Sequence, residues 1–256
     1  MSGLWPALVA ARLAHPSALR AVRRLRSRTG AALVGFVALA SSACAEPTTI
    51  KVDLLRHGVG IPPYDFDFWQ TGGGPPGRWA VVRDPTAFAG VAIEQFSTDK
   101  AQGRLPLAIY HPISLKNVLV TVRFELLEGS TQAAGIAVRV TSADSYYVAV
   151  ASAREKRVDL FRFIGDQRRW IAGATANVAC QKWQTLSVIG VENRFTVALN
   201  DVPVIVASDN GFAGDGHVAL WTEEDNVTRF EEIVIAPAVY QDGTLVPEHK
   251  EFEVKK

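Results

Sequence analysis

The chain is poor in residues that cross-link a fold or bind metals. Its 256 residues include two cysteines, Cys44 and Cys180. The segment around Cys44 predicts that this residue is removed or acylated, which leaves Cys180 without an intrachain partner. We interpret Cys180 as a half-buried strand thiol, because no histidine lies near it in the sequence. The histidines beyond the N-terminal segment show no metal-ligand spacing, so we expect no zinc site; they are His57, His111, His217 and His249.

Recognised catalytic motifs are also missing. No serine stands in the context of a nucleophile elbow. The glycine- and proline-rich run from Gly72 to Gly77 lacks the lysine and the following helix of a phosphate-binding loop. The sequence therefore indicates architecture and compartment more clearly than chemistry.

A strong net charge is absent, since the formal value is +1. Residues 1–45 contain six arginines and no acidic residue, so residues 46–256 hold 21 of the 27 basic and all 26 acidic residues, a net charge of −5. A mildly acidic body argues against a nucleic-acid partner, which needs a basic face. It equally argues against binding to an anionic membrane surface.

Long hydrophobic runs are absent as well. The apolar stretch 31–40 is shorter than the ~18–20 residues of a membrane span. It follows an arginine-rich stretch and precedes Ala43-Cys44-Ala45, a small-x-small cleavage site, so residues 1–45 are predicted to be a secretory signal peptide. We expect a periplasmic or secreted protein. The alternative is a lipoprotein acylated on Cys44, although serine stands where a lipobox usually has leucine.

Short strand-like runs follow one another from 79 to 235, with no convincing helix between them. They are rich in β-branched and aromatic residues, and several alternate in polarity. In 118–126 every second residue is apolar, which is typical of a half-buried strand. The predicted strands are 79–83, 91–95, 107–110, 118–126, 134–141, 146–153, 157–163, 183–190, 194–199, 202–207, 217–222 and 229–235.

This pattern predicts an all-β fold, an antiparallel two-sheet sandwich. Asn200-Asp201 is the short loop of a hairpin, and Pro203 indicates an edge strand or a bulge. We expect a leader at 46–63, the sandwich at 64–236 and a loose tail at 237–256.

Several motifs in order resemble bacterial secreted domains of the concanavalin A-like lectin/glucanase superfamily, closest to the 3-keto-disaccharide hydrolase-like domain of unknown function. The resemblance covers roughly 64–236. Its motifs are Asp65-Phe-Asp67, Gly77-Arg-Trp79, Gly135-Ile-Ala-Val-Arg139, Asp144-Ser-Tyr-Tyr147, Lys182-Trp183, Asn193–Asn200 and Gly216–Trp221. The resemblance implies a jelly-roll sandwich whose concave sheet carries a ligand groove. Fold resemblance by itself does not imply an activity.

Strand alternation suggests which side chains line such a groove. We expect Arg139, Tyr147, Trp221 and Glu223 to face outward as a ligand-binding set. Aromatic rings cover the apolar face of a sugar, and charged groups bind its hydroxyls. In the alternative interpretation Tyr147 and Trp221 belong to the core, and Arg139 pairs with a structural acid.

Signals for catalysis and metal binding are weak. Active glucanases of the resembling superfamily carry a Glu-x-Asp-x-x-Glu strand motif, which this sequence lacks. The cluster Glu223-Glu224-Asp225 is better explained as a solvated acidic loop, and Asn226 indicates a turn there. Asp65 and Asp67 offer oxygen ligands for a structural Ca²⁺, the one candidate cofactor.

Three functions remain open. The first is a secreted carbohydrate-binding module, with a carbohydrate ligand as its partner. The second is a hydrolase acting on glycans, and the third is a non-catalytic structural or interaction protein of the envelope. The sequence does not indicate an oligomeric state.

Overall fold

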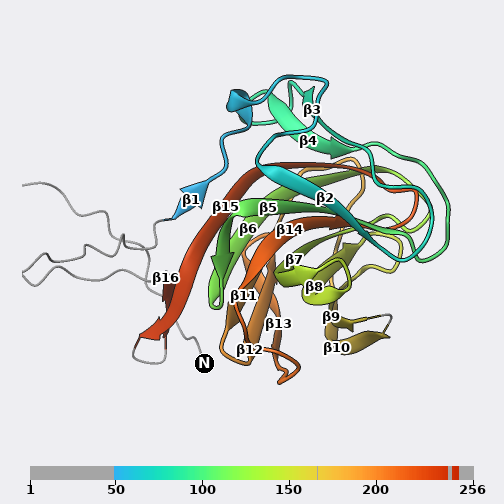
Figure 1. Cartoon of the computed structure of the whole chain (residues 1–256). Helices are drawn as coiled ribbons and strands as arrows, with labels where there is room; N and C mark the ends of the chain where they lie inside the picture. Colours follow the sequence, from blue (N-terminus) through green and yellow to red (C-terminus); the bar gives the residue numbers. More distant parts are fainter. Residues whose placement is uncertain (1–48, 166, 242–243, 248–256) are drawn as a thin grey trace, which may run out of the picture. The chain divides into compact units, whose positions relative to one another are not determined.

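A computed structural model describes residues 49–165, 167–241 and 244–247 (Figure 1). The predicted signal peptide 1–45, including Cys44, lies outside the described residues. Among the described residues no helix reaches the length and hydrophobicity of a membrane span.

One sheet has seven strands, in the order β10-β9-β8-β7-β14-β5-β2. All its pairings are antiparallel. In chain order the strands are β2 (Phe66–Thr71), β5 (Leu105–Leu115), β7 (Ala133–Ser142), β8 (Ser145–Ser152), β9 (Arg157–Ile164), β10 (Gln167–Thr175) and β14 (Gly216–Thr222).

The other sheet has nine strands within the described residues. Its main path runs β13-β12-β11-β6-β15-β4-β3, and β1 and β16 also pair with β15. Its strands are β1 (Ile50–Lys51), β3 (Trp79–Arg83), β4 (Val91–Gln95), β6 (Val118–Glu128), β11 (Gln184–Val191), β12 (Arg194–Leu199), β13 (Val202–Ser208), β15 (Val227–Gln241) and β16 (Thr244–Pro247). The described helical structure is one short 3-10 turn, η1 (Leu54–Arg56).

The predicted all-β, two-sheet antiparallel fold is therefore confirmed. Pro203 lies in β13, the terminal strand of its sheet, beside a register shift in the pairing with β12, as its chemistry requires. Strand pairing also reaches the segments on either side of the predicted sandwich. β1 in the predicted leader pairs with β15, while β15 continues to Gln241 and pairs with β16, so 237–241 and 244–247 of the predicted tail are strand.

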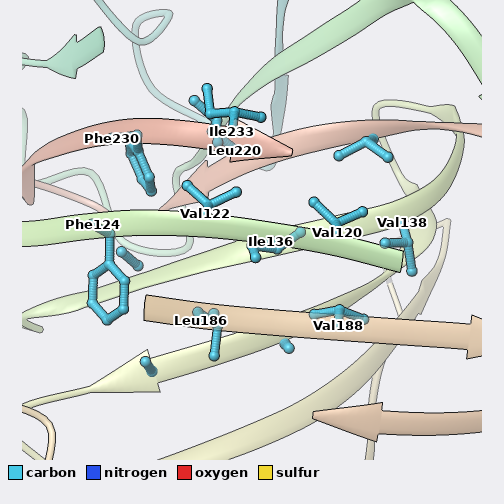
Figure 2. Close-up of a cluster of buried hydrophobic side chains, with 14 of the residues drawn as sticks. Val120, Val122, Phe124, Ile136, Val138, Leu186, Val188, Leu220, Phe230 and Ile233 are labelled. Atoms are coloured by element: carbon cyan, nitrogen blue, oxygen red, sulfur yellow. The ribbon is translucent and has the colours of Figure 1, made fainter. Parts of the chain in front are cut away.

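The main core lies between the sheets. Val118, Val120, Val122, Phe124 and Leu126 of β6 alternate with half-exposed neighbours, and all five are buried, as predicted. Figure 2 shows side chains of β6 beside those of β11 and of the facing sheet. The cross-strand pairs Val122–Leu186 and Val120–Val188 bring apolar side chains together on one face, which is how antiparallel sheets are stabilised.

A second apolar layer covers the opposite face of the seven-stranded sheet. We name this the outer face. In β14, Val218 and Leu220 belong to the main core, whereas Ala219 and Trp221 belong to the outer layer. The buried members of this layer are Leu105, Leu107, Ile109, Ala133, Ala137, Val140, Tyr146, Val148, Val150, Phe163, Ala219 and Trp221. The candidate site lies on this layer.

Candidate functional site

Two hollows on the outer face meet at Arg168 and Glu223. The first has a volume of about 220 Å³ and the second about 380 Å³, and both of these residues line both hollows. The remaining lining of the first is Thr131, Ala133, Val150, Ser152, Arg154, Glu155, Asp159 and Phe161. The remaining lining of the second is Thr71, Gly72, Gly103, Leu105, Asp144, Phe163 and Gly165.

The shared wall is an ion pair held on an aromatic ring. Arg168 Nη1 lies 3.1 Å from Glu223 Oε1, and the Arg168 guanidinium lies 3.9 Å from the centre of the Phe161 ring. Burial raises the pKa of Glu223, although Arg168 opposes that rise. The pair thus combines a cation at the surface with a carboxyl group that is partly withdrawn from water.

An exposed tryptophan lies on the same face, two residues beyond Arg168 on β10. Trp170 is opposite Phe161 in the register, and 54% of it is exposed. Its Nε1 donates to Asp159 Oδ1 at 2.8 Å. Arg157 donates to both oxygens of Asp159 through Nε and Nη2. The indole is therefore held by a hydrogen bond while its ring remains open to solvent.

The floor between these groups is apolar and built from small residues. Ala133 of β7 lines the first hollow, and Ala137 of the same strand is buried in the outer layer. Between them a Cβ on Gly135 would lie 2.4 Å from the carbonyl oxygen of Ala149, so only glycine fits. Beneath the second hollow Tyr146 stacks on Phe163 with ring centres 4.7 Å apart. Burial raises the pKa of Tyr146 to about 12, which keeps the phenol neutral.

A tight turn after β14 positions Glu223. Strand β14 ends at Thr222, and Glu224 adopts a positive φ of 50°. The Asp225 carboxylate accepts from Ser130 N at 2.8 Å. Asn226, which is completely buried, accepts from Gln132 N at 2.8 Å. The predicted turn at Asn226 is present, and it separates Glu223 from Asp225.

Trp221 faces away from the main core, as alternation predicted, but it is completely buried. It packs in the outer layer with Tyr146 and Leu107 instead of contacting solvent. The expectation that Trp221 is an exposed sugar platform is therefore wrong, because the outer face carries its own apolar layer.

Tyr147 and Arg139 are also buried. Tyr147 points into the main core, 4.5 Å from the Phe195 ring centre, so Tyr146 is the tyrosine on the outer face. Arg139 adopts a φ of 52° where the β7–β8 register shifts. Its guanidinium donates to three backbone carbonyls, those of Lys116, Phe212 and Glu192. Neither residue reaches the hollows; of the predicted set, Glu223 alone lines them.

The two aspartates proposed as calcium ligands each approach a histidine. Asp65 Oδ1 lies 3.2 Å from His57 Nε2, and Asp67 Oδ1 lies 3.7 Å from His111 Nδ1. Within the described part of the chain no group of three or more histidine, cysteine or acidic side chains is placed to hold a metal ion. These residues do not form the oxygen-rich shell that Ca²⁺ takes.

Sequence reasoning missed Arg168 and Trp170, because it missed the strand that carries them. The segment 167–175 contains two arginines and a run of alanine and glycine, a weak strand signal. The available signal was Arg168-x-Trp170, because residues two apart on a strand share a face.

Comparisons with known proteins identify the fold. No protein-family model matches the chain, and no curated protein matches it. A cellulose-induced protein, Cip1, is similar in structure, with a TM-score of 0.51 and 11% identity over 73% of this chain and 96% of that chain. A Bacillus subtilis protein of unknown function with a galectin-like fold gives 0.50 and 10% identity, over 69% and 91% of the two chains.

The Bacillus subtilis carbohydrate binding module CBM66 is 21% identical over 61% of this chain and 89% of that chain, with a TM-score of 0.49. With the first two likenesses and its two antiparallel sheets, this chain has a galectin-like, concanavalin A-like sandwich fold.

Proposed function

We propose that the protein is a glycan-binding β-sandwich and that a saccharide binds on the outer face of the seven-stranded sheet. The observation that carries this proposal is Trp170, an exposed indole fixed by Asp159 beside two arginine–carboxylate pairs. Carbohydrate-binding proteins are present among the structures with related folds, but a fold by itself does not determine function, and the side chains of the site carry the proposal.

The chemistry of these side chains matches a pyranose or furanose ring. A sugar presents C–H groups on one face, which an aromatic ring covers, and hydroxyl groups around its edge. Arg157 and Arg168 donate hydrogen bonds, while Asp159 and Glu223 accept them, so the site offers charged partners of both kinds. Because the two acids are already oriented by their arginines, little side-chain freedom is lost on binding.

The direct test is a glycan-array screen with residues 46–256, followed by calorimetry on the strongest hit with the Trp170→Ala variant. We expect saturable binding of one sugar class and a loss of affinity of tenfold or more in Trp170→Ala. Phe88→Ala is the matched control, because Phe88 is a 72% exposed aromatic residue on the loop between β3 and β4 and lines neither hollow. Equal affinity in the wild type and Trp170→Ala, or no glycan bound at all, would exclude the proposal.

A hydrolase acting on glycans is the second candidate. It is favoured by one observation: the first hollow contains three carboxyl groups, and burial raises the pKa of one of them, Glu223. A carboxyl group with a raised pKa is suited to protonating a leaving oxygen, while a second carboxylate assists the attack on the sugar. Glu155 and Asp159 are the candidates for that second role.

Glu223→Gln distinguishes catalysis from binding. If the bound glycan is hydrolysed, we expect this variant still to bind it, because glutamine keeps one acceptor oxygen, and to cleave it at least 100-fold more slowly, measured by product chromatography. No cleavage by the wild type would leave the protein a binding module. Cleavage at an unchanged rate in Glu223→Gln would remove Glu223 from the mechanism.

Export is part of the proposal, on the strength of the N-terminal segment described above. The intact mass of protein expressed in a bacterial host and recovered outside the cytoplasm checks it. A mass that begins at Glu46 indicates cleavage after Ala45, and a diacylated or triacylated Cys44 indicates a lipoprotein. Full-length protein retained in the cytoplasm would contradict both.

A further inference from the structure

The β9–β10 hairpin carries charged residues on both of its faces. On β10, Arg168 and Trp170 belong to the outer face, and Arg169 between them belongs to the opposite face. Arg162 of β9 belongs to that opposite face too. Arg162 and Arg169 are directly opposite each other in the antiparallel register. Like charges in such a pair lie ~5 Å apart at Cβ and repel each other, so this arrangement costs stability unless an anion lies between them.

Among the described residues that line the hollow at this pair, one is acidic, Asp209, and its Oδ1 oxygen accepts three hydrogen bonds. Asp209 forms an ion pair with Arg162, and it also accepts from Tyr147 Oη and Gly211 N, both at 2.8 Å. Arg162 is mostly buried, with 13% of its side chain exposed. Arg169 is exposed, and none of the described residues forms an ion pair with it. The cluster of Arg162, Arg169 and Asp209 therefore carries a net positive charge.

The loop after β13 closes around the Arg162 guanidinium. A Cβ on Gly211 would lie 2.2 Å from Arg162 Nη1, so a larger residue at this position would require the Arg162 side chain to shift. Asn210 Oδ1 accepts from Asn193 Nδ2 at 3.0 Å, which ties the same loop to the turn between β11 and β12. The arginine head and the loop thus form a fixed surface.

A hollow of about 420 Å³ lies at this surface, lined by Arg162, Arg169, Ser208, Asp209, Asn210 and Gly211. It contains the end of β13 and both strands of the hairpin, elements that contact one another at the edges of the two sheets (Figure 1). It shares no lining residue with the two hollows of the outer face.

We propose that this hollow is an oxyanion-binding site, which we name the hairpin site, and that it binds a carboxylate, sulfate or phosphate group. Guanidinium groups bind such anions through paired N–H donors. Arg162 and Arg169 hold the anion from two strands, and Ser208 contributes a hydroxyl group at the rim. Asp209 acts by fixing Arg162 and does not contact the anion. The hairpin site does not depend on the proposed glycan function, since no residue is common to both.

The test is an NMR titration of residues 46–256 with inorganic sulfate, inorganic phosphate and acetate in separate arms, each at constant ionic strength balanced with sodium chloride. We expect saturable shifts of the amide signals of residues 208–211. In Arg169→Gln we expect the dissociation constant to rise at least fivefold. Arg83→Gln is the matched control, because it removes the same charge from an exposed position at the end of β3.

Saturation by sulfate and phosphate alone would assign the hairpin site to a tetrahedral anion, such as a sulfated or phosphorylated ligand. Saturation by acetate would extend it to a carboxylate, such as a uronic acid. Shifts that do not saturate in any arm, or that saturate equally in wild type and Arg169→Gln, would overturn the proposal. Loss of binding in Arg83→Gln to the same degree would also overturn it, because net charge would then explain the effect.

Discussion

Two buried arginines organise this sandwich at the residue scale. Arg104 and Arg139 are both completely buried, and burial lowers the pKa of each. Their guanidinium groups donate to backbone carbonyls, three in each case. A buried cation is tolerated only when its donors are satisfied, so each arginine ties together loops that would otherwise leave carbonyl groups unpaired.

Trp221→Ala tests whether the outer layer is a second core. The residue is completely buried among apolar side chains, so its removal should lower the free energy of unfolding by about 3–5 kcal/mol. Urea denaturation followed by circular dichroism measures this. Trp170→Ala is the matched comparison, since Trp170 is 54% exposed and should cost much less. A Trp221→Ala protein of unchanged stability with weakened glycan binding would restore Trp221 to the ligand surface.

We expect Asp84 to make the free energy of unfolding depend on pH in the acidic range. Burial by itself would raise its pKa, but hydrogen bonds from Thr86 and the Arg229 guanidinium lower it. A carboxyl group whose pKa is lower in the folded protein than in the unfolded chain stabilises the fold at pH values above the unfolded-state pKa of ~3.9. This stabilisation is lost as the pH falls through the folded-state pKa. Asp84→Asn should therefore be less stable at pH 7, and the difference from wild type should shrink below about pH 4.

Urea midpoints measured between pH 7 and pH 2.5 check this dependence. Asp201→Asn makes the same charge change at an exposed turn position and serves as the control. A stability difference for Asp84→Asn that stays constant across the pH range would show that the effect is steric and does not arise from ionisation.

Individual residues also show where sequence reasoning about the site stopped. Alternation placed Trp221 on the correct face of the sheet. It could not show that Trp221 is buried, because that depends on packing with Tyr146 and Leu107 from other strands. Alternation shows that Tyr146 and Tyr147 take opposite faces but not which of them faces outward, and the choice of Tyr147 was wrong. Glu223 was predicted correctly as a lining residue because it directly follows β14, whose alternation of core-facing and outward residues extends to it.

At the scale of elements, strands with a clear sequence pattern were predicted and strands with a weak one were not. Strands β3, β4 and β12 have the predicted bounds, because they are short and rich in β-branched or aromatic residues. Strand β10 was missed, since it is a half-exposed edge strand whose residues gain little from burial. Edge strands depend on pairing with a neighbour, which a local pattern does not record. The site residues on β10 were lost with it.

Arg104→Met tests whether one side chain holds the wall of the second hollow. Arg104 donates to the carbonyls of Pro75 at 2.6 Å, Glu224 at 2.5 Å and Pro76 at 3.2 Å, and so connects the glycine-rich loop to the turn after β14. Methionine fills similar volume but leaves these carbonyls unpaired, at about 1–3 kcal/mol each. We expect lower stability and weaker glycan binding.

Hydrogen exchange locates the effect of this variant. Amides of Gly72–Gly74, Gly77 and residues 223–226 should exchange faster in Arg104→Met, while those of β11 and β12 should keep their protection. Uniform acceleration across both sheets would mean that Arg104 supports the whole fold and has no special role at the hollow.

At the scale of the whole molecule, the two-sheet antiparallel sandwich follows from the number of alternating strands and from the tight turns between them. The edges of the domain do not follow from this pattern. The segment before residue 64 has one short strand-like run, and its place was decided by long-range pairing: Ile50 lies opposite Ile235, and Val52 N donates to Ile233 O at 2.9 Å. Two residues of strand carry too little pattern to predict such a contact.

The leader is therefore predicted to be part of the domain, and Leu54 with its neighbour Leu55 provides a matched test. Leu54 is 5% exposed and lies in the main core, whereas Leu55 is 65% exposed. Leu54→Ser should lower the free energy of unfolding by about 2–4 kcal/mol, through the loss of buried apolar surface and the burial of a hydroxyl group. Leu55→Ser should change it by less than about 0.5 kcal/mol.

Removal of residues 46–63 should lower the free energy of unfolding by more than Leu54→Ser does, because it also exposes Ile233 and Ile235 on β15. If residues 64–256 unfold at the same urea concentration as residues 46–256, the leader is an appendage and the fold begins at β2.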